Sequence, residues 1–405
     1  MSKITVLGGC GVVGSVAVKT LTMLPDFSEV VIGDINIEKA HGIIEEIGSK
    51  KLSAEIVDAL NLESIKNAIN DSDVVLNCIG PYYKFAPPIM KAVIEEGRNY
   101  VDVCDDVDAT REILKLDAAA KRANICALIG MGSSPGVTNL LAKFAADQLL
   151  DEVDSIDLYH AHGGEPFEGV GVIGHRIHSM LIDIPIYIDG KYKTAQFFSE
   201  EGKDLEEEID FIKLGTYKVH PYPHPEIITL PKYIKGVKRV TNKGTVLPPE
   251  YFQLIIDMVR LGLVDEKPLN VQGKMVSPLD FTISFIIDQR EKILKETNFG
   301  TQRGCVKIVI KGLKAGKNHQ YVFSLASENQ AMGEGTGIPA ALAAVLMQRG
   351  MIKEKGILPP EACVNPLDFL NIMQEFLGLE KVGGEGSPLF IESIDDKGQV
   401  ERISL

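Results

Sequence analysis

The first 34 residues constrain the fold more than any other part of the chain. A short apolar run at residues 3–8 leads into the turn Gly-Cys-Gly-Val-Val-Gly at residues 9–14, and a segment with helical apolar spacing follows. A second apolar run, residues 29–33, ends at Asp34. This order of strand, G-x-G-x-x-G turn, helix and strand predicts the first βαβ unit of a dinucleotide-binding sheet. The alternative is a glycine turn in another kind of α/β protein.

Each position of this turn has an expected role. Gly9 is expected to permit the tight bend, Gly11 to let a pyrophosphate approach the backbone, and Gly14 to let helix and strand pack closely. The first turn of the helix, at Val12, Val13 and Gly14, points its N–H groups and the positive end of its dipole at that pyrophosphate. These five residues are the predicted cofactor-binding turn.

Asp34 bears on the choice of cofactor. A carboxylate at the end of the second strand can accept hydrogen bonds from both ribose hydroxyls of adenosine, and it repels a 2′-phosphate. The residues that follow, Ile35, Asn36 and Ile37, include no Arg that could hold such a phosphate. The sequence therefore favours NAD, while Lys39 keeps NADP open.

Length, charge and cysteine usage exclude several classes of protein. A chain of 405 residues predicts two domains, and 45% hydrophobic with 24% charged residues is typical of a soluble globular protein. A net charge of −14 argues against nucleic-acid or anionic-membrane partners. The six Cys form no C-x-x-C pair, so neither a zinc site nor a disulfide framework is predicted. With no signal peptide or membrane-spanning run recognised, we expect a cytoplasmic enzyme.

Strands and helices alternate up to about residue 132. Helices are predicted at 36–47, 62–69, 87–96 and 107–122, and strands at 54–57, 73–79, 100–104 and 125–129. Together with the first two strands this makes six, the number in a doubly wound parallel sheet of the Rossmann type. We therefore expect an α/β protein with a Rossmann domain at residues 1–132.

The pattern changes after residue 132. A helix is predicted to open at Pro135 and Gly136, strands at 155–159, 185–188 and 217–222, helices at 249–263 and 278–294, and a hairpin at 306–310 and 321–325. These elements predict an α+β catalytic domain with a mixed or antiparallel sheet at residues 133–334. A final buried helix is predicted at 336–347, with Thr336 as N-cap and Pro339 in its first turn. Residues 335–405 are expected to return to the Rossmann domain.

Several later motifs resemble a known family. They are Asn-Cys-Ile-Gly-Pro-Tyr-Tyr at 77–83, Gly-Ser-Ser-Pro-Gly-Val-Thr-Asn at 132–139, Gly-Thr-Gly-Ile-Pro-Ala at 335–340 and Gly-Ile-Leu-Pro-Pro-Glu at 356–361. In this order, and with His-Pro-Glu at 224–226 between them, the chain resembles the saccharopine dehydrogenase (saccharopine reductase-like) family. Relatives in that family include lysine 6-dehydrogenase and carboxynorspermidine synthase.

The resemblance implies a Rossmann domain joined to an α+β catalytic domain, and a nicotinamide cofactor used to oxidise or form a C–N bond through an imine. It also implies that Gly80 and Pro81 run along the cofactor. Many saccharopine-reducing members carry an acidic residue before the Pro-Gly turn, where this chain has Ser134. The resemblance therefore leaves the substrate open.

The ends of the fourth and fifth strands offer candidate catalytic residues, because ligands of a doubly wound sheet bind beyond the C-terminal strand ends. Tyr82 or Tyr83 can cap the nicotinamide or donate to the substrate, or both can pack on the second domain. Asp105 is a candidate contact for a substrate amine or for the nicotinamide ribose. Its neighbour Asp106 is expected to cap the next helix.

Histidines supply the candidate proton carriers. His175 and His178 share a face if their segment is helical, and His224 lies with His220 on a proline-rich loop. No third ligand marks a metal site beside the pair, so no metal is predicted.

Two arginines are candidate clamps for a substrate carboxylate. A guanidinium matches a carboxylate bidentately, which suits Arg176 and Arg239 to this role. Either arginine can instead form an ordinary surface ion pair.

These observations support three hypotheses of function. The first is an NAD(P)-dependent oxidoreductase that acts on the CH–NH or CH–NH2 group of an amino acid or an opine-type adduct. The second keeps this fold but makes polyamine precursors, as carboxynorspermidine synthase does. The third is a non-catalytic NAD-sensing protein. For each enzyme hypothesis we expect a small-molecule amino-acid or imine substrate and a homodimer.

Overall fold

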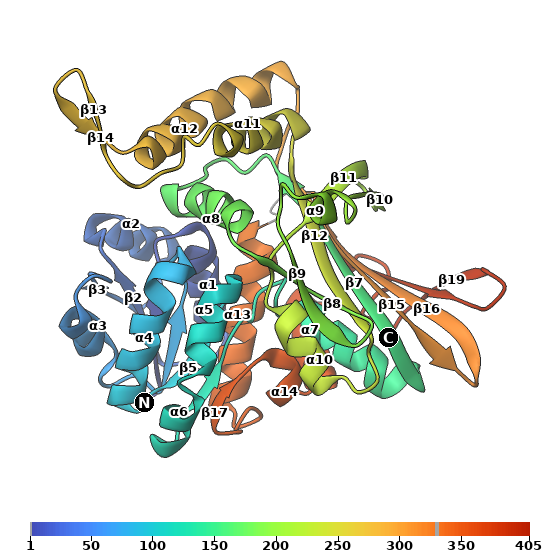
Figure 1. Cartoon of the computed structure of the whole chain (residues 1–405). Helices are drawn as coiled ribbons and strands as arrows, with labels where there is room; N and C mark the ends of the chain where they lie inside the picture. Colours follow the sequence, from blue (N-terminus) through green and yellow to red (C-terminus); the bar gives the residue numbers. More distant parts are fainter. Residues whose placement is uncertain (1, 329–331) are drawn as a thin grey trace.

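A seven-stranded parallel sheet forms the N-terminal part of the computed structural model, which describes residues 2–328 and 332–405 (Figure 1). Its strand order is β17-β6-β5-β4-β1-β2-β3. The bounds are β1 Lys3–Leu7, β2 Glu29–Asp34, β3 Leu52–Ile56, β4 Val74–Asn77, β5 Asn99–Asp102, β6 Cys126–Leu128 and β17 Gly356–Leu358. The first six strands follow the order of a doubly wound Rossmann sheet, and β17 extends it beyond β6.

Helices cover both faces of this sheet. They are α1 Val12–Met23, α2 Ile37–Ile47, α3 Leu62–Ile69, α4 Tyr82–Glu96, α5 Val107–Leu114, α6 Asp117–Arg122 and α13 Met332–Gln348. Alternate strand residues enter different cores, with Val6 packed on the side of α1 and Leu7 on the side of α3 and α4. Burial on both faces explains why the strands appear in the sequence as continuous apolar runs.

The second sheet has ten strands and is mixed. The order of its main path is β10-β11-β12-β7-β15-β16-β18-β19, and β8 pairs with β12 and β9. The bounds are β7 Glu152–Gly163, β8 Ile184–Ile188, β9 Lys191–Ala195, β10 Glu207–Phe211, β11 Gly215–Pro221, β12 Arg239–Leu247, β15 Arg303–Lys314, β16 Lys317–Ser327, β18 Leu389–Ile394 and β19 Val400–Ile403. Strands β7 and β12 are parallel, and the other pairs are antiparallel.

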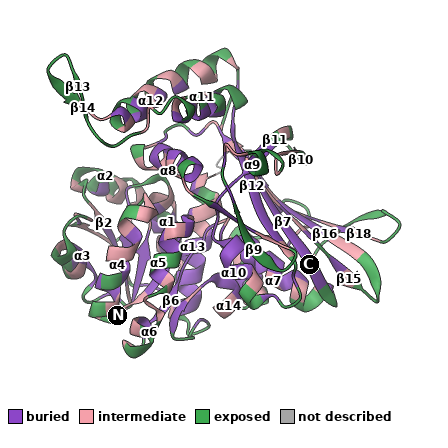
Figure 2. Ribbon diagram, in the orientation of Figure 1, coloured by how far each residue is buried: buried purple, intermediate pink, exposed green. Residues whose placement is uncertain are grey.

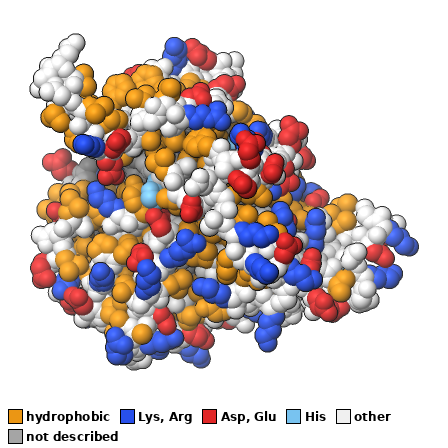
Figure 3. Space-filling view, in the orientation of Figure 1, with side chains coloured by type: hydrophobic (Ala, Val, Ile, Leu, Met, Phe, Trp, Pro, Cys, Tyr) orange, Lys and Arg blue, Asp and Glu red, His pale blue; other side chains and the backbone are white. Residues whose placement is uncertain are grey.

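Further helices surround the second sheet. They are α7 Val137–Phe144 with a π-helical turn at Ala145–Leu149, α8 Val170–Leu181, α9 Glu200–Lys203, α10 Glu226–Tyr233, α11 Pro249–Arg260, α12 Pro278–Glu296, α14 Pro360–Cys363 and α15 Pro366–Leu377. A small hairpin, β13 Leu269–Val271 and β14 Lys274–Val276, projects from the loop between α11 and α12 (Figure 1). Its apolar side chains Leu269, Val271 and Met275 are exposed. Figure 3 shows hydrophobic surface next to this projecting hairpin.

Helix α13 joins the two sheets. It is apolar all round and largely buried, and it packs against α1, β4 and β5 (Figure 2). A Cβ atom on Gly337 would lie 2.6 Å from the carbonyl oxygen of Val13, so this glycine lets α13 approach α1 closely. Because Val6 of the first sheet and Leu158 of the second belong to one continuous core, the two sheets pack as one body around this helix.

The predicted α/β class, a Rossmann sheet combined with an α+β unit, is confirmed, as are most of the predicted elements. Two helix predictions in the first sheet differ. Helix α4 begins at Tyr82 rather than at residue 87, and a carboxylate of Asp106, distant in sequence, accepts from the N–H of Tyr83. The helix predicted at 107–122 is broken into α5 and α6, and Asp117 accepts from the N–H of Ile357 in β17.

The prediction for the apolar helix near residue 340 is wrong in detail. Helix α13 begins at Met332, so Thr336 is not its N-cap and Pro339 lies inside the helix rather than in its first turn. It is also not the final helix, because α14 and α15 follow. The tight contact at Gly337 depends on α1, which the local sequence does not reveal.

The C-terminal segment divides between the two sheets. Strand β17 pairs with β6 in the parallel sheet, whereas β18 pairs with β16 in the mixed sheet. None of the helices in the described residues is long and apolar enough to cross a membrane.

Candidate active site

The glycine turn between β1 and α1 fits a pyrophosphate. The atom nearest to a Cβ on Gly11 would be the carbonyl oxygen of Gly8, at 3.3 Å, so the outer side of the turn is open. A Cβ on Gly14 would lie 2.2 Å from the same oxygen, so Gly14 is required for the packing of α1 on the turn. Gly8 adopts the left-handed conformation, with φ of 74°, and a Cβ on Gly9 would lie 2.9 Å from Cγ2 of Ile32, so Gly9 lets the turn pack on β2.

The first turn of α1 faces outward from this bend. Gly11 is the N-cap of α1, and within the described residues no side chain caps this helix. The N–H groups of Val12, Val13 and Gly14 have no acceptors within the helix, so they are suited to a bound anion. When bound, a nicotinamide cofactor supplies or accepts a hydride, and this turn would hold its pyrophosphate.

Asp34 lies beside the same turn. Its Oδ2 accepts from the N–H of Cys10 at 2.9 Å, and its Oδ1 accepts from the N–H of Asn36 at 3.0 Å. Each carboxylate oxygen has two acceptor positions, so each keeps one for a ribose hydroxyl. The backbone bonds fix the orientation of the carboxylate that the sequence assigned to the adenosine ribose.

The loop after β4 lies against the start of α8. A Cβ on Gly171 would be 3.5 Å from the carbonyl oxygen of Gly80 and 3.6 Å from Cδ of Pro81. Tyr82 follows and packs against both hydrophobic cores of the parallel sheet. Because burial raises the pKa of Tyr82 well above its usual value, the phenol stays protonated. Gly80 and Pro81 therefore lie between the parallel sheet and helix α8.

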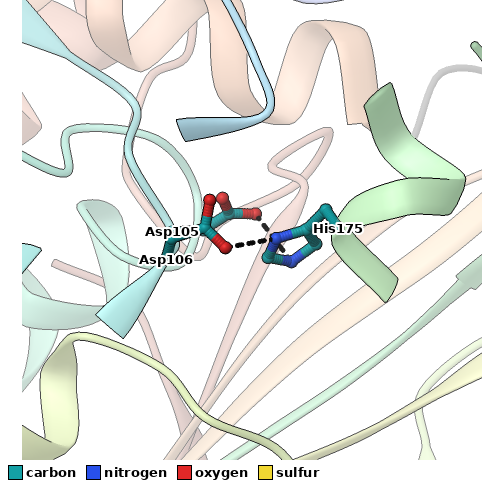
Figure 4. Close-up of side chains that lie close together, drawn as sticks. All are labelled: Asp105, Asp106 and His175. Carbon is teal, nitrogen blue, oxygen red and sulfur yellow. Dashed lines mark hydrogen bonds and ion pairs between the residues drawn. The ribbon is translucent and has the colours of Figure 1, made fainter. Parts of the chain in front are cut away.

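The densest charged cluster in this region joins the end of β5 to α8 (Figure 4). Nδ1 of His175 lies 2.6 Å from Oδ1 of Asp106, and Nε2 of His175 lies 3.5 Å from Oδ2 of Asp105. Asp106 also accepts from the N–H of Tyr83 at 2.8 Å. The helix-capping role expected for Asp106 is wrong, because its carboxylate makes these contacts instead of a cap. The side chain of Asp105 is 33% exposed, so a substrate can reach it.

Charges in the cluster oppose the effect of burial. Burial alone would lower the pKa of His175, but Asp105 and Asp106 outweigh it and raise this pKa well above its usual value. Burial raises the pKa of Asp105 in spite of the neighbouring His175. For Asp106, burial acts in the same direction, but the His175 charge and hydrogen bond hold its pKa low. His175 is thus a cation held between two acidic side chains of different proton affinity.

His178 lies one turn further along α8. Its ring stacks on Tyr83 with centroids 3.9 Å apart, and its Nε2 lies 2.8 Å from Oδ2 of Asp108. His175 and His178 therefore both face the parallel sheet, as their spacing predicted. Of the two, His175 is the one in contact with Asp105.

Tyr222 is a site residue that the sequence analysis did not name. Its hydroxyl lies 3.2 Å from Nε2 of His175, and its ring makes an edge contact with His160 at 5.0 Å. A Cβ on Gly244 would lie 1.9 Å from the His160 ring, so this glycine makes room for it on the sheet. In the sequence, Tyr222 lies between His220 and His224 in a proline-rich stretch. That stretch is the sequence feature that could have pointed to Tyr222 as a site residue.

The two arginines proposed as carboxylate clamps do not join the cluster. Arg176 is buried, and its Nη1 lies 2.5 Å from Oε2 of Glu168, so it already has a carboxylate partner. Arg239 pairs with Asp157 at 2.8 Å. Side chains alternate along a strand, so Arg239 lies on the opposite face of the sheet from the His160 side.

Three ligand atoms of Asp105, Asp106 and His175 lie within 4.8 Å of one another, as they would around a metal ion. The ion pairs between His175 and the two carboxylates account for this proximity. No metal is needed to explain the arrangement, and the absence of a metal stays a prediction.

Two family models match the chain. The saccharopine dehydrogenase NADP binding domain matches residues 4–128, and the saccharopine dehydrogenase C-terminal domain matches residues 132–379. The chain belongs to the saccharopine dehydrogenase family. The resemblance drawn from the motifs is thus confirmed, and the chain is a saccharopine dehydrogenase-like, NAD(P)-binding oxidoreductase.

Two relatives are similar over nearly their whole length. Carboxynorspermidine synthase of Vibrio cholerae is 28% identical over 401 residues, covering 91% of this chain and 93% of the relative. Carboxyaminopropylagmatine dehydrogenase of Synechocystis sp. is 24% identical over 392 residues, covering 91% and 94%. Apo saccharopine dehydrogenase (L-Glu forming) from Saccharomyces cerevisiae has a similar structure, with a TM-score of 0.65 at 18% identity over 93% of this chain and 98% of that chain. The structural likeness supports the fold alone.

In this family member, the chain's own residues can hold and move protons at the edge of the parallel sheet. The side chain of Asp105 is open enough to meet a cationic amine, and His175 beside it can exchange a proton with that amine. Asp106 holds His175 from the other ring nitrogen, which fixes its orientation. The arrangement is therefore suited to amine chemistry.

Proposed function

We propose that this protein is an NAD(P)-dependent oxidoreductase that forms or oxidises a secondary amine through an imine, with a polyamine-type amine and a carbonyl compound bearing a carboxylate as partners. The observation that carries the proposal is the Asp105–His175–Asp106 cluster at the C-terminal edge of the dinucleotide-binding sheet. Substrates of doubly wound enzymes bind at that edge.

The charge of the site supports an amine substrate. Asp105, Asp106 and Asp108 are acidic groups at the end of β5 and the start of α5. A cationic amine arriving beside Asp105 replaces water at a carboxylate, whereas a neutral or anionic substrate has no such partner.

The relatives support the polyamine-type partner. The names of these two relatives both describe polyamine-like chains that carry a carboxyl group. Saccharopine or lysine as substrate is the alternative, and the family membership keeps it open. A non-catalytic NAD sensor is the remaining alternative, and the acid–base cluster disfavours it.

The proposal includes a preference for NAD. Asp34 offers acceptors to both ribose hydroxyls and repels a 2′-phosphate. The family model is described as an NADP binding domain, so both cofactors belong in the experiment.

The experiment is a substrate screen with purified protein. Aspartate β-semialdehyde is combined with putrescine, agmatine or no amine, and oxidation of NADH or NADPH is followed by loss of nicotinamide fluorescence. Lysine and saccharopine are tested with NAD+ and NADP+ in the oxidative direction. Turnover that requires an amine together with the aldehyde supports the proposal. Turnover with lysine or saccharopine alone moves the assignment to the amino-acid alternative, and tight cofactor binding without turnover supports the sensor.

A further inference from the structure

Three motifs that are far apart in the sequence meet in one buried polar network. They are the segment 132–139, the His-Pro-Glu segment 224–226 and the segment 356–361. They contribute one end of α7, the loop before α10 and the start of α14 respectively. The acid–base role proposed for His175 does not use this network.

The network centres on Glu226, whose side chain is fully buried. Its Oε2 lies 2.5 Å from Nδ1 of His224. Its Oε1 accepts from the hydroxyl of Ser134 at 2.6 Å and from the hydroxyl of Thr138 at 2.9 Å. Although burial acts in the opposite direction, the neighbouring His224 holds the pKa of Glu226 below its usual value. Glu226 is therefore an ionised carboxylate whose hydrogen bonds go to side chains of this network.

A second buried carboxyl group extends the network. Nδ2 of Asn139 donates to Oε2 of Glu361 at 2.8 Å, and Oδ1 of Asn139 accepts from the N–H of Gly136 at 2.9 Å. The hydroxyl oxygen of Thr138, whose proton is donated to Glu226, lies 3.3 Å from the same Oδ1. Glu361 is only 2% exposed, and burial raises its pKa to about 7. The adjacent residues Thr138 and Asn139 thus hold Glu226 and Glu361 respectively, so the two carboxyl groups belong to one buried network.

The ring of His224 lies beside residues of the candidate active site. Its ring centroid lies 6.0 Å from that of Tyr222, whose hydroxyl contacts His175, and 5.9 Å from that of His160. Over the described residues, Nε2 of His224 has no hydrogen-bond partner, whereas Nδ1 is held by Glu226. This is the arrangement of an acid–base imidazole oriented by a carboxylate.

The charges around His224 favour its protonated form. Burial lowers its pKa, but Glu226 and Asp105 outweigh burial and the repulsion from His175, so the pKa is raised. The neighbouring His160 is driven the other way, because burial and the surrounding cations lower its pKa well below the usual value. Of these two histidines, His224 is therefore the one suited to donate a proton near neutral pH.

We propose that His224 is a second proton donor, which protonates the oxygen that leaves when the amine and the carbonyl compound condense, and that Glu226 is its positioning residue. This inference rests on the proposed function and deepens it. An imine-forming enzyme must transfer protons at two different atoms, the amine nitrogen and the carbonyl oxygen. Asp105 and His175 serve the nitrogen, and His224 serves the oxygen.

The step balances without an oxidant or reductant. The amine nitrogen bonds to the carbonyl carbon and gives a carbinolamine. Nε2 of His224 donates its proton to the carbinolamine hydroxyl, the C–O bond breaks, water leaves, and the nitrogen lone pair completes the C=N bond. In the reverse direction neutral His224 takes a proton from the water that attacks the imine carbon. Each turnover uses one proton of His224, and the solvent then reprotonates His224.

The test measures this step in the absence of any nicotinamide. The probe is isotopic oxygen exchange between water and the carbonyl of aspartate β-semialdehyde, with putrescine or agmatine present. We expect the amine-dependent exchange rate of the folded His224→Asn variant to fall about 10²- to 10⁴-fold, the usual effect of removing a general acid. We expect Glu226→Gln to lower the pKa of His224 in an NMR titration of the imidazole protons.

The matched control is His220→Gln. His220 lies near the end of β11, four residues before His224, and also pairs with a glutamate, Glu206 at 2.7 Å, but it takes no part in the network. The control should keep the wild-type exchange rate. Wild-type exchange in folded His224→Asn, or an unchanged His224 titration in Glu226→Gln, overturns this inference and leaves the proposed function standing. A wild-type protein that accelerates no exchange with either amine overturns both.

Discussion

Nδ1 of His175, in α8, lies 2.6 Å from Oδ1 of Asp106, and this contact connects α8 to the edge of the parallel sheet. Asp106 is buried and also accepts from the N–H of Tyr83. The contact therefore both orients a proposed catalytic imidazole and fixes the position of α8 over the dinucleotide site.

The His175–Asp106 pair should stabilise the fold most in mildly acidic solution. The raised pKa of His175 gives a contribution that is complete below the unfolded pKa and is lost as the pH rises through the folded value. The lowered pKa of Asp106 gives one that is complete above the unfolded pKa and is lost as the pH falls through the folded value. Both contributions to the free energy of unfolding are fully present between about pH 4 and about pH 6.5.

Asp106→Asn should therefore lower the free energy of unfolding by roughly 3 kcal/mol near pH 5.5, because it removes the closer of the two carboxylates that pair with the buried imidazolium and leaves only Asp105, at 3.5 Å. The loss should shrink toward alkaline pH. Urea unfolding at several pH values measures it. Asp108→Asn is the control, since its partner His178 and its own carboxylate are more exposed, and it should cost under about 1 kcal/mol. A loss for Asp106→Asn that does not change with pH would show that this ion pair does not stabilise the fold.

Replacing Asp34 with Ala should weaken the binding of NADH and improve the relative binding of NADPH. The ribose loses its acceptor and the 2′-phosphate loses a repelling charge. Because the chain contains no Trp, the fluorescence of the reduced nicotinamide can be titrated without energy transfer from tryptophan. If the wild-type protein already binds NADPH more tightly than NADH, the role given to Asp34 is wrong.

Replacing Gly11 with Val should nearly abolish cofactor binding in a folded protein. The nearest atom to a Cβ at this position is the carbonyl oxygen of Gly8, at a tight 3.3 Å, so a small shift of the turn accommodates the Cβ, but the larger side chain occupies the approach of the pyrophosphate. The same titration reports binding, and thermal unfolding reports the fold. Gly14→Val serves as the contrast, since its Cβ would lie 2.2 Å from a carbonyl oxygen and it should destabilise the fold itself. Undiminished affinity in Gly11→Val would exclude this turn as the pyrophosphate site.

How far the sequence could predict the fold depended on whether a contact was local. The strand–turn–helix unit at residues 3–34 was predictable because its glycines and apolar spacing report a local geometry. The start of α13 was not, because the tight contact of Gly337 with Val13 involves a helix more than 300 residues earlier in the chain.

The same difference between local patterns and long-range contacts applies to the candidate site. Asp105, His175 and His178 could be named from strand ends and helical spacing. The pairing of Asp106 with His175, the place of Tyr222 and the burial of Arg176 depend on how α8 packs against the sheet. No local pattern carries that information, so the capping role for Asp106 was the natural but wrong prediction.

We expect His178 to act through position rather than as a proton carrier. Its ring stacks on Tyr83 and its Nε2 is held by Asp108, whereas His175 contacts Asp105. His178→Phe, which keeps the stacked ring, should keep turnover within a few-fold, and His178→Ala should lower it further without changing cofactor affinity. Steady-state kinetics on both variants measures this. A loss of 10²-fold or more in His178→Phe, the size expected for a removed acid–base group, would make His178 a proton carrier instead.

The pH profile of kcat/KM for amine oxidation, compared between the wild-type protein and Asp105→Asn, tests the central claim most directly. Oxidation requires a neutral base, so the wild-type rate should rise toward alkaline pH as His175 loses its proton. Asp105 is the strongest of the charges that raise the pKa of His175. Asp105→Asn should therefore shift this rise to lower pH and reduce the plateau about 10²-fold or more, with cofactor affinity retained. A profile of unchanged position and height in the folded variant would contradict the assignment of Asp105 and His175 as the acid–base pair.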